Sequence, residues 1–184
     1  MELKYVFSKK DIKKFINFSK TVYCNDPYYR DSMSAIERVF LTGATAFLEH
    51  AEIYPFWVEE EKEVLARAAF IIDYHQKDML MVSFFEAKAG AQADVDLIIK
   101  EAKKIAHQKG LKRIVFGLNG HLNYGVGFLA SHFQTTPSFG FSYNPGYYLN
   151  FFPGCKEYNF TSFLVDISCF NMQKERAILE RIKK

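Results

Sequence analysis

The chain has few cysteines, and it lacks the apolar segments that target a protein to a membrane or cross one. Its three cysteines, Cys24, Cys155 and Cys169, show no Cys-x-x-Cys spacing, which argues against a disulfide framework and against a thiolate zinc site. Residues 1–7 contain no signal-peptide core, and no apolar run reaches the length of a membrane span. The sequence therefore predicts a cytoplasmic protein with reduced thiols and no membrane partner.

A strong charge of either sign is also missing. The formal net charge is +3, and the lysines are spread over several segments instead of forming one stripe, so no nucleic-acid partner is expected. Aromatic residues are abundant, with 19 Phe and 11 Tyr among 184 residues. Because large rings dominate the energetics of hydrophobic cores, this composition predicts one aromatic-rich domain.

The spacing of apolar residues predicts a mixed α/β fold. Ser8 and Asp11 are close to a capping box at the start of an amphipathic helix. Residues 79–85 are nearly all apolar, which is typical of a strand buried on both faces. We expect the next amphipathic helix to begin at Asp94 and to stop at Gly110, and the strand–helix–strand order implies a parallel pairing. Strands are expected at 3–7, 53–59, 64–74, 79–85, 113–116 and 160–167, and helices between 8 and 25 and at 32–41, 94–110 and 147–152.

Two loops after the strand 113–116 have the composition of a ligand site. The first, 117–128, contains four glycines and two asparagines, Asn119 and Asn123, and the second, 142–148, contains Asn-Pro followed by two tyrosines, Tyr147 and Tyr148. Glycine lets a backbone approach a ligand closely or adopt positive φ, and a helix start favours anions. The asparagine amides either bind a ligand or stabilise the turns. We therefore expect a ligand site near these loops.

Several short motifs carry a resemblance to a known family. They are Asp26-Pro27, Phe-Leu-Glu-His-Ala-Glu at 47–52, Phe-Phe-Glu-Ala at 84–87, Gly-Leu-Asn at 117–119 and Tyr-Asn-Pro-Gly-Tyr-Tyr at 143–148. On these residues the chain resembles the GCN5-related N-acetyltransferase (GNAT) superfamily of acyl-CoA-dependent acyltransferases, and within it an uncharacterised group of bacterial proteins. The resemblance implies an α/β fold in which helices flank a mixed sheet with splayed central strands.

The resemblance also implies a domain organisation. Similar proteins commonly continue into a second GNAT-like half. We therefore expect a GNAT-like domain at 1–170 and a helical tail or linker at 171–184. The chain then corresponds to the N-terminal half of a duplicated architecture or to a short member of the group, and a second GNAT-like half or a homodimer is the expected protein partner.

A site for acetyl-CoA is the next implication of the resemblance. In the GNAT fold the pantetheine lies between the splayed strands, here 79–85 and 113–116. The pyrophosphate sits on backbone N–H groups at the start of the intervening helix, where an anion is favoured. The matching loop here, 87–93, has one glycine and no arginine, whereas typical members have Arg/Gln-x-x-Gly-x-Gly/Ala. The candidate cofactor-binding residues are Lys88, Ala89, Gly90, Ala91, Gln92 and Asn119.

Acyl transfer to an amine needs a base for the ammonium and an acid for the leaving thiolate. Many GNAT enzymes place a glutamate on the first splayed strand, and Glu86 is the carboxylate at that place. Burial beside phenylalanines is expected to raise its pKa. The usual acid is a tyrosine four residues before a Gly-Phe pair. Counting back from Gly154 reaches Asn150, so the neighbouring Tyr148 is the candidate acid.

Glu49, His50 and Glu52 form a compact ionisable cluster. Their spacing in the chain does not bring three side chains to one point, and no His-x-x-x-His motif accompanies them. We expect a local turn network at these residues and no metal site.

Two functions agree with these patterns. The first is an acyl-CoA-dependent N-acyltransferase that moves an acetyl group to a small-molecule amine, with Glu86 as the base and the amine beside residues 117–124. The second is a non-catalytic GNAT-like binding or interaction module with a degenerate CoA site. The departures in the loop 87–93 and at Asn150 favour the module, and the carboxylate of Glu86 favours the enzyme.

Overall fold

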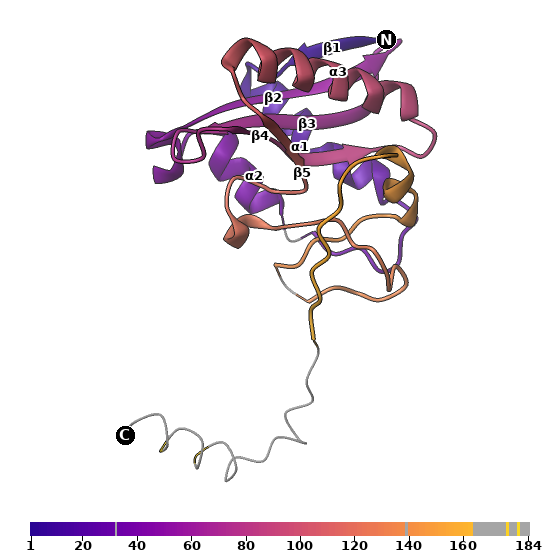
Figure 1. Cartoon of the computed structure of the whole chain (residues 1–184). Helices are drawn as coiled ribbons and strands as arrows, with labels where there is room; N and C mark the ends of the chain where they lie inside the picture. Colours follow the sequence, from indigo (N-terminus) through magenta and orange to yellow (C-terminus); the bar gives the residue numbers. More distant parts are fainter. Residues whose placement is uncertain (32, 139, 164–175, 177–179, 181–184) are drawn as a thin grey trace.

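The computed structural model describes residues 1–31, 33–138, 140–163, 176 and 180 of the chain. In this part of the chain, five strands form one sheet in the order β1-β2-β3-β4-β5 (Figure 1). The elements are β1 (Glu2–Tyr5), α1 (Lys9–Val22), α2 (Ser34–Leu41), the 3₁₀ helix η1 (Ala46–Glu49), β2 (Ala51–Glu60), β3 (Glu63–Asp73), β4 (Met79–Ala87), α3 (Gln92–Lys109), β5 (Arg113–Phe116), and the 3₁₀ helices η2 (Leu122–Tyr124) and η3 (Gly146–Phe151).

The sheet is mixed, and its last two strands diverge. Strands β1 to β4 pair antiparallel, and β5 pairs parallel with β4, as the strand–helix–strand order predicted. The β4–β5 pairing ends at Val82 and Phe116, whereas β4 continues to Ala87. The predicted α/β fold with splayed central strands is therefore confirmed.

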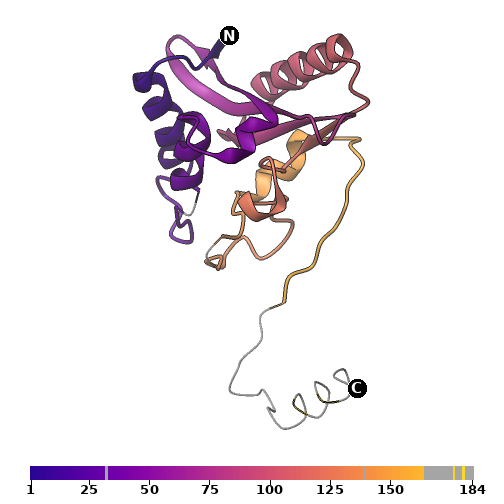
Figure 2. The same ribbon diagram turned by 90° about the vertical axis from the view of Figure 1, so that its left-hand side faces the viewer.

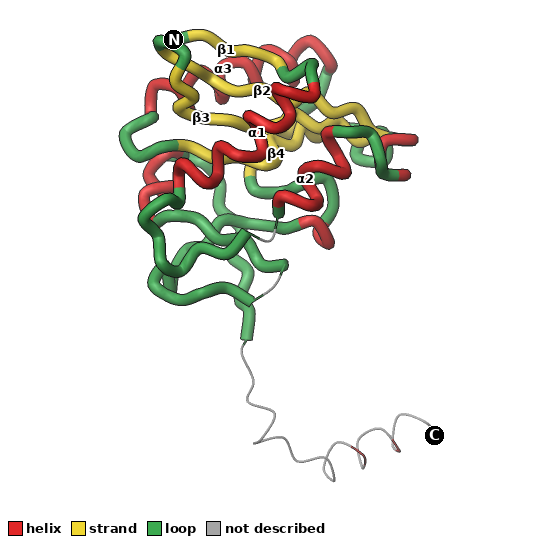
Figure 3. The backbone as a smooth tube through the Cα atoms, turned by 180° about the vertical axis from the view of Figure 1, so that it is seen from behind, coloured by secondary structure: helices red, strands yellow, loops and turns green. Residues whose placement is uncertain are grey.

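Helices cover both faces of the sheet. Figure 2 shows α1 and α2 on one side of the strands and α3 on the other, and the view from behind shows α1 and α2 in front of the sheet (Figure 3). Alternate residues of each strand enter two separate cores, so the inner strands are apolar on both faces. On the α3 side the core includes Phe56, Val58, Ala66, Ala68 and Phe70, and on the α1 side it includes Trp57, Ala69, Ile71, Phe15 and Phe40.

The helix ends follow from local hydrogen bonding. Ser8 caps α1, and the predicted capping box with Asp11 is present, with the Asp11 N–H 3.1 Å from Ser8 Oγ. Helix α3 ends at Gly110, where φ is +69°. Its predicted start at Asp94 is wrong, because Ala91 is the N-cap and Asp94 lies within the first turn.

The C-terminal part of the chain differs from the expectation. Residues 160–163 form no strand, and the rest of the strand predicted at 160–167 lies outside the described residues. The boundary predicted at 170/171, and the tail 171–184 apart from Arg176 and Glu180, also lie outside them. Within the described part of the chain, no helix is both long enough and apolar enough to cross a membrane.

Candidate functional site

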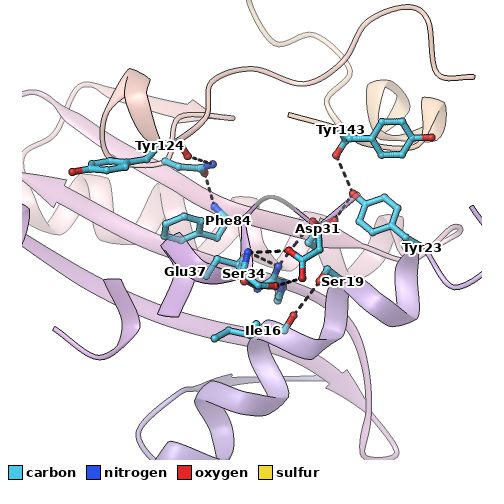
Figure 4. A network of polar contacts seen from close by, with 12 residues as sticks. Ile16, Ser19, Tyr23, Asp31, Ser34, Glu37, Phe84, Tyr124 and Tyr143 are labelled. Carbon is cyan, nitrogen blue, oxygen red and sulfur yellow. Dashed lines mark hydrogen bonds and ion pairs between the residues drawn. The ribbon is translucent and has the colours of Figure 1, made fainter. Parts of the chain in front are cut away.

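A bulge in β4 is the feature that builds the site. Arg67 of β3 pairs with Glu86, and Ala69 pairs with Ser83, so two residues of β4 lie opposite one residue of β3. Phe84, at the bulge, has φ of +50°, a conformation that costs a bulky residue on the order of 1–3 kcal/mol. Its N–H group donates a hydrogen bond of 2.8 Å to Asn119 Oδ1, a side chain from the loop after β5 (Figure 4).

The bulge reverses which residues of β4 face which core. Before it, Leu80 and Val82 pack in the core on the α3 side, and after it Phe85 and Ala87 do. Glu86 lies between Phe85 and Ala87, so its side chain points to the face that α1 and α2 cover. Without the bulge, Glu86 would continue the row of Leu80 and Val82 into the α3 core.

Two tyrosine hydroxyls donate hydrogen bonds to the Glu86 carboxylate. Tyr23, at the end of α1, lies 2.7 Å from Glu86 Oε2, and Tyr148 of η3 lies 2.6 Å from the same oxygen. The Glu86 side chain is 15% exposed. Burial raises the pKa of Glu86 to about 7, even though a guanidinium and two hydroxyl donors lie beside the carboxylate. The fold therefore places a carboxyl group that titrates near neutrality between three separate segments of the chain.

A buried ion pair controls the charge beside Glu86. Arg67 and Glu37 are 1% and 3% exposed, and the guanidinium donates two hydrogen bonds of 2.8 and 2.7 Å to the Glu37 carboxylate. The guanidinium also lies over the ring of Phe15, 4.4 Å from its centroid. The guanidinium lies 3.9 Å from Glu86 Oε1. The positive charge of Arg67 is therefore balanced mainly by Glu37 and only weakly by Glu86. This unequal sharing agrees with the raised pKa of Glu86.

Two hollows meet at Glu86. The larger lies in the gap where β4 and β5 diverge, and the smaller lies against α1 and α2; with the open solvent at their mouths included, they hold about 490 and 310 Å³. Both are open to solvent. Four residues line both hollows: Met33, Glu37, Glu86 and Tyr143. The larger hollow is also lined by Phe85, Gly117, Asn119, Phe128, Asn144 and Tyr148. The smaller hollow is also lined by Ser19, Tyr29, Arg30, Asp31 and Ser34.

The loop 142–148 is fastened to α1 by hydrogen bonds that involve the motif residues. The hydroxyl of Tyr143 donates to Oδ2 of Asp26, in the turn after α1, at 2.7 Å. The backbone carbonyl of Tyr143 lies 3.2 Å from the Tyr23 hydroxyl (Figure 4). Asn144 is buried and accepts the Leu129 N–H at 2.6 Å. The glycine-rich loops therefore line the larger hollow, and the ligand site expected near them stays a prediction.

The predicted cofactor loop lies where β4 leads into α3. No side chain caps the N-terminus of α3, and Gly90 has φ of +81°, where an added Cβ would meet no atom within 4 Å. Lys88 forms an ion pair with Glu63 of β3. Ala89 is exposed, Ala91 is buried in the α3-side core, and Gln92 donates to Asp96 at 2.9 Å. The loop thus offers free helix N–H groups, but its cation is already paired.

Of the two candidate positions for the acid, Tyr148 and not Asn150 lies beside Glu86. Asn150 is exposed, whereas Tyr148 is 1% exposed and also accepts the Ala87 N–H at 2.8 Å. Burial and the nearby carboxylate raise the pKa of Tyr148 well above 10, so its proton stays on oxygen at neutral pH. The amide of Asn119 lines the larger hollow, but both of its ends are used, by Phe84 N–H and by the Tyr124 carbonyl.

Sequence reasoning did not find Tyr23, Arg67 or Glu37 as site residues. Tyr23 is the last apolar position of the amphipathic α1 pattern, which marked it as a core residue. Arg67 carried a weak signal, because a charged residue in an apolar strand needs a buried partner. The partner, Glu37, comes from another element 30 residues away, and no spacing in the sequence connects the two.

The cluster of Glu49, His50 and Glu52 does not converge. Glu52 accepts hydrogen bonds from the hydroxyls of Tyr54, at 2.5 Å, and Tyr74. His50 turns away from both glutamates to Asp73, with its Nδ1 2.9 Å from Asp73 Oδ1.

No protein-family model and no curated protein matches the sequence. Similar solved structures include an acetyltransferase assigned to the GNAT family, from Staphylococcus aureus, with 18% identity, 62% of this chain and 98% of that chain covered, and a TM-score of 0.44. Another is an aminoglycoside acetyltransferase from an uncultured soil metagenomic sample, in complex with trehalose (11% identity; 89% and 95% covered; TM-score 0.48). A third is a predicted acetyltransferase with acetyl-CoA, from Clostridium acetobutylicum (12% identity; 91% and 97% covered; TM-score 0.49). At these values the likeness assigns neither a substrate nor a site residue to this chain.

Proposed function

We propose that this chain is a GNAT-like N-acyltransferase that transfers an acetyl group from acetyl-CoA to a small-molecule amine, with Glu86 as the general base. The observation that carries this proposal is the state of Glu86. Its carboxyl is nearly buried, has a pKa of about 7, and borders both hollows of the site. A base with a pKa near the working pH is the efficient one, because it is largely ionised and still takes up a proton readily.

Tyr148 is suited to return a proton to the leaving thiolate. Its hydroxyl donates to Glu86 Oε2, so the proton that Glu86 removes from the ammonium passes to Tyr148 as Tyr148 protonates the sulfur. The C–N bond forms, the C–S bond breaks with its electron pair on sulfur, and the second ammonium proton leaves to solvent. The net proton transfer, from a carboxyl of pKa about 7 to a thiolate of pKa about 8.5, is favourable.

Acetyl-CoA supplies the acyl group and the thiolate when it is bound. The gap beyond Val82 and Phe116, with its hollow of about 490 Å³, is the place for the thioester end. Ala91, the N-cap of α3, has no polar side chain, so the backbone N–H groups of the first turn are offered to an anion such as a pyrophosphate. The acidic residue of that turn, Asp94, is buried, and burial raises the pKa of its carboxyl. Ala93 lies exposed in the first turn of α3, so close approach of a phosphate meets no bulky side chain.

The smaller hollow supports an ammonium acceptor. It contains the carboxylates of Asp31, Glu37 and Glu86 and the ring of Tyr29, and carboxylates and aromatic faces both attract cations. Arg30 also lines it, but its guanidinium donates to the carbonyls of Pro27 and Tyr29 at 2.9 and 2.7 Å. Those carbonyls are neutral, so Arg30 keeps its charge and offsets Asp31, while Glu37 is already paired with Arg67. The attraction for an ammonium acceptor therefore comes from Glu86 when it is ionised.

Calorimetric titration of acetyl-CoA and CoA into Ala93→Glu and Gln108→Glu tests the proposal. Each substitution adds one carboxylate at an exposed position of α3, at its first turn or near its C-terminus. We expect the wild-type chain and Gln108→Glu to bind alike and Ala93→Glu to bind at least 10-fold more weakly. Release of CoA thiol with a panel of primary amines should then depend on Glu86. Absence of heat with wild-type protein at millimolar ligand would contradict the proposal.

A second candidate is a non-catalytic GNAT-like module that binds a second half or a second copy. Tyr147 and Tyr148 occupy the backbone C=O and N–H of Ala87 at 2.9 and 2.8 Å, which are groups that a ligand in the gap would otherwise use. In addition, Phe160 and Phe163 are 78% and 85% exposed. Sedimentation of the chain and of a Phe160→Ser/Phe163→Ser variant tests this candidate. A wild-type dimer that dissociates in the variant supports the module, and a wild-type monomer opposes self-association.

A further inference from the structure

Two histidines and an aspartate meet at the open end of the β2–β3 hairpin. His50 precedes β2, Asp73 ends β3, and His75 follows in the turn to β4. Asp73 Oδ1 lies 2.9 Å from His50 Nδ1 and 3.9 Å from His75 Nδ1. One ligand atom from each residue lies within 4.8 Å of the other two. This trio differs from the cluster that the sequence pattern singled out, because it joins the residue before β2 to the end of β3 and the turn that follows.

The fold fixes two of the three side chains and leaves the third free to adjust. Asp73 pairs with Ala51 in the β2–β3 ladder, and its side chain is 8% exposed. The edge of the Phe47 ring packs on the His50 imidazole, with ring centroids 5.0 Å apart. The His75 side chain is 72% exposed, so it rotates at little cost in packing.

We propose that His50, Asp73 and His75 bind a divalent transition-metal ion of the zinc type, with water completing its coordination. Ligand atoms 2.0–2.1 Å from a tetrahedral zinc ion lie roughly 3.3 Å apart, between the 2.9 and 3.9 Å separations found here. Imidazole and carboxylate are a donor set that zinc accepts. Binding requires the exposed His75 ring to turn out of its stack on His50, where the centroids are 4.2 Å apart. It also displaces the proton of the hydrogen bond between His50 Nδ1 and Asp73 Oδ1, which is released to solvent.

The fold also orients the central ligand. The backbone N–H of His75 donates to Asp73 Oδ1 at 2.9 Å, which is the kind of second hydrogen bond that holds a ligating carboxylate in place. Oδ1 is the oxygen that faces both imidazoles, at 2.9 and 3.9 Å, and it is the ligand atom of the proposal; within the described residues, no hydrogen bond reaches Oδ2. The site therefore has a buried, oriented carboxylate between two imidazoles.

The site lies far from Glu86. Arg67 faces Glu86 across β3 and β4, and Asp73 is six residues further along β3, a distance of roughly 20 Å. The ion consequently takes no part in acyl transfer and lies outside the proposed function. It would connect the start of β2 to the β3–β4 turn, and because it binds only the folded chain, it would raise the stability of the protein.

Zinc titration of thiol-alkylated protein tests the inference. Alkylation is needed because Cys24 and Cys155 are exposed thiols that also bind zinc. The diagnostic variant is His75→Ala, which keeps the backbone bond to Asp73, and the matched control is His107→Ala, an exposed histidine on α3. The readouts are calorimetric stoichiometry, the Tm, and the d–d absorption of Co²⁺ as a zinc substitute.

We expect the wild-type chain and His107→Ala to bind one zinc ion, and His75→Ala to bind at least about 10-fold more weakly, since even outer-shell partners of metal sites are worth this much. At zinc concentrations 100 times the Kd, the wild-type Tm should rise by roughly 5–10 °C. Intense Co²⁺ bands that vanish in His75→Ala would support tetrahedral coordination. Equal zinc affinity in wild-type protein and His75→Ala, or absence of stoichiometric binding, would overturn the inference.

Discussion

Replacing Glu86 by glutamine should change how the stability of the protein depends on pH. The pKa of Glu86 rises from 4.5 to about 7 on folding, which corresponds to roughly 3 kcal/mol of lost stability once the carboxylate is ionised. Glutamine has nearly the same shape and does not titrate. The variant should therefore lack this loss and keep the surrounding packing.

The sign follows from the proton balance. Between pH 4.5 and 7 the folded chain holds a proton on Glu86 that the unfolded chain has released. Raising the pH therefore stabilises the unfolded state relative to the folded state. The free energy of unfolding of the wild-type protein therefore falls progressively up to about pH 7, and above that value the loss linked to Glu86 is complete. The free energy of unfolding of Glu86→Gln minus that of wild type should therefore increase by roughly 2–3 kcal/mol from pH 5 to pH 8.

Urea denaturation of both proteins at half-unit pH steps measures this difference. Glu157→Gln, which makes the same change at an exposed carboxylate, is the control and should follow wild type at every pH. The acyl-transfer rate gives a second readout. The kcat/KM of the wild-type protein should rise as the pH passes about 7, and the kcat/KM of Glu86→Gln should be lower by 100-fold or more.

A difference between Glu86→Gln and wild type that is constant over this pH range would refute the reasoning. It would mean that Glu86 ionises equally well in the folded and unfolded chain. A constant difference together with an intact rate would also remove Glu86 from the proposed mechanism.

Three further changes test the surroundings of Glu86. Tyr148→Phe removes a donor to the carboxylate, so the midpoint of the pH–rate profile should move upward, and acetyl-CoA affinity measured by calorimetry should stay within about 3-fold. In Glu37→Gln the charge of Arg67 is free to stabilise the Glu86 carboxylate, so the midpoint of the pH–rate profile should move downward. Urea denaturation of this variant should show a loss of stability on the order of 3 kcal/mol, because the buried ion pair is broken. Asn119→Ala removes both the acceptor of the Phe84 N–H and the donor to the Tyr124 carbonyl, and urea denaturation should show a loss of about 1–3 kcal/mol of stability.

The main elements of the fold could be predicted because their signals are local. The capping box at Ser8, the apolar run of β4 and the stop at Gly110 depend on neighbouring residues. Local composition was not enough at residues 160–163, the described part of the strand expected at 160–167, because they have strand-like composition but pair with no strand among the described residues.

The site was only half predictable. Glu86 and Tyr148 could be named as candidates, yet their 2.6 Å contact depends on a bulge that no sequence pattern announced. Plain strand alternation would have sent Glu86 into the α3-side core with Leu80 and Val82. The bulge requires Phe84 to adopt φ of +50°, which a propensity argument would reject.

The bulge and the Arg67–Glu37 pair together explain why Glu86 is suited to act as a base. The bulge brings Glu86 to the face where Arg67 lies, and a free guanidinium at that distance would hold the carboxylate ionised at low pH. Glu37 prevents this, because it binds the guanidinium at 2.7 and 2.8 Å and leaves Glu86 at 3.9 Å. A buried ion pair contributes little net stability in general. Its effect here is on the neighbouring carboxyl, whose pKa remains about 7, the range in which a base for an ammonium group works.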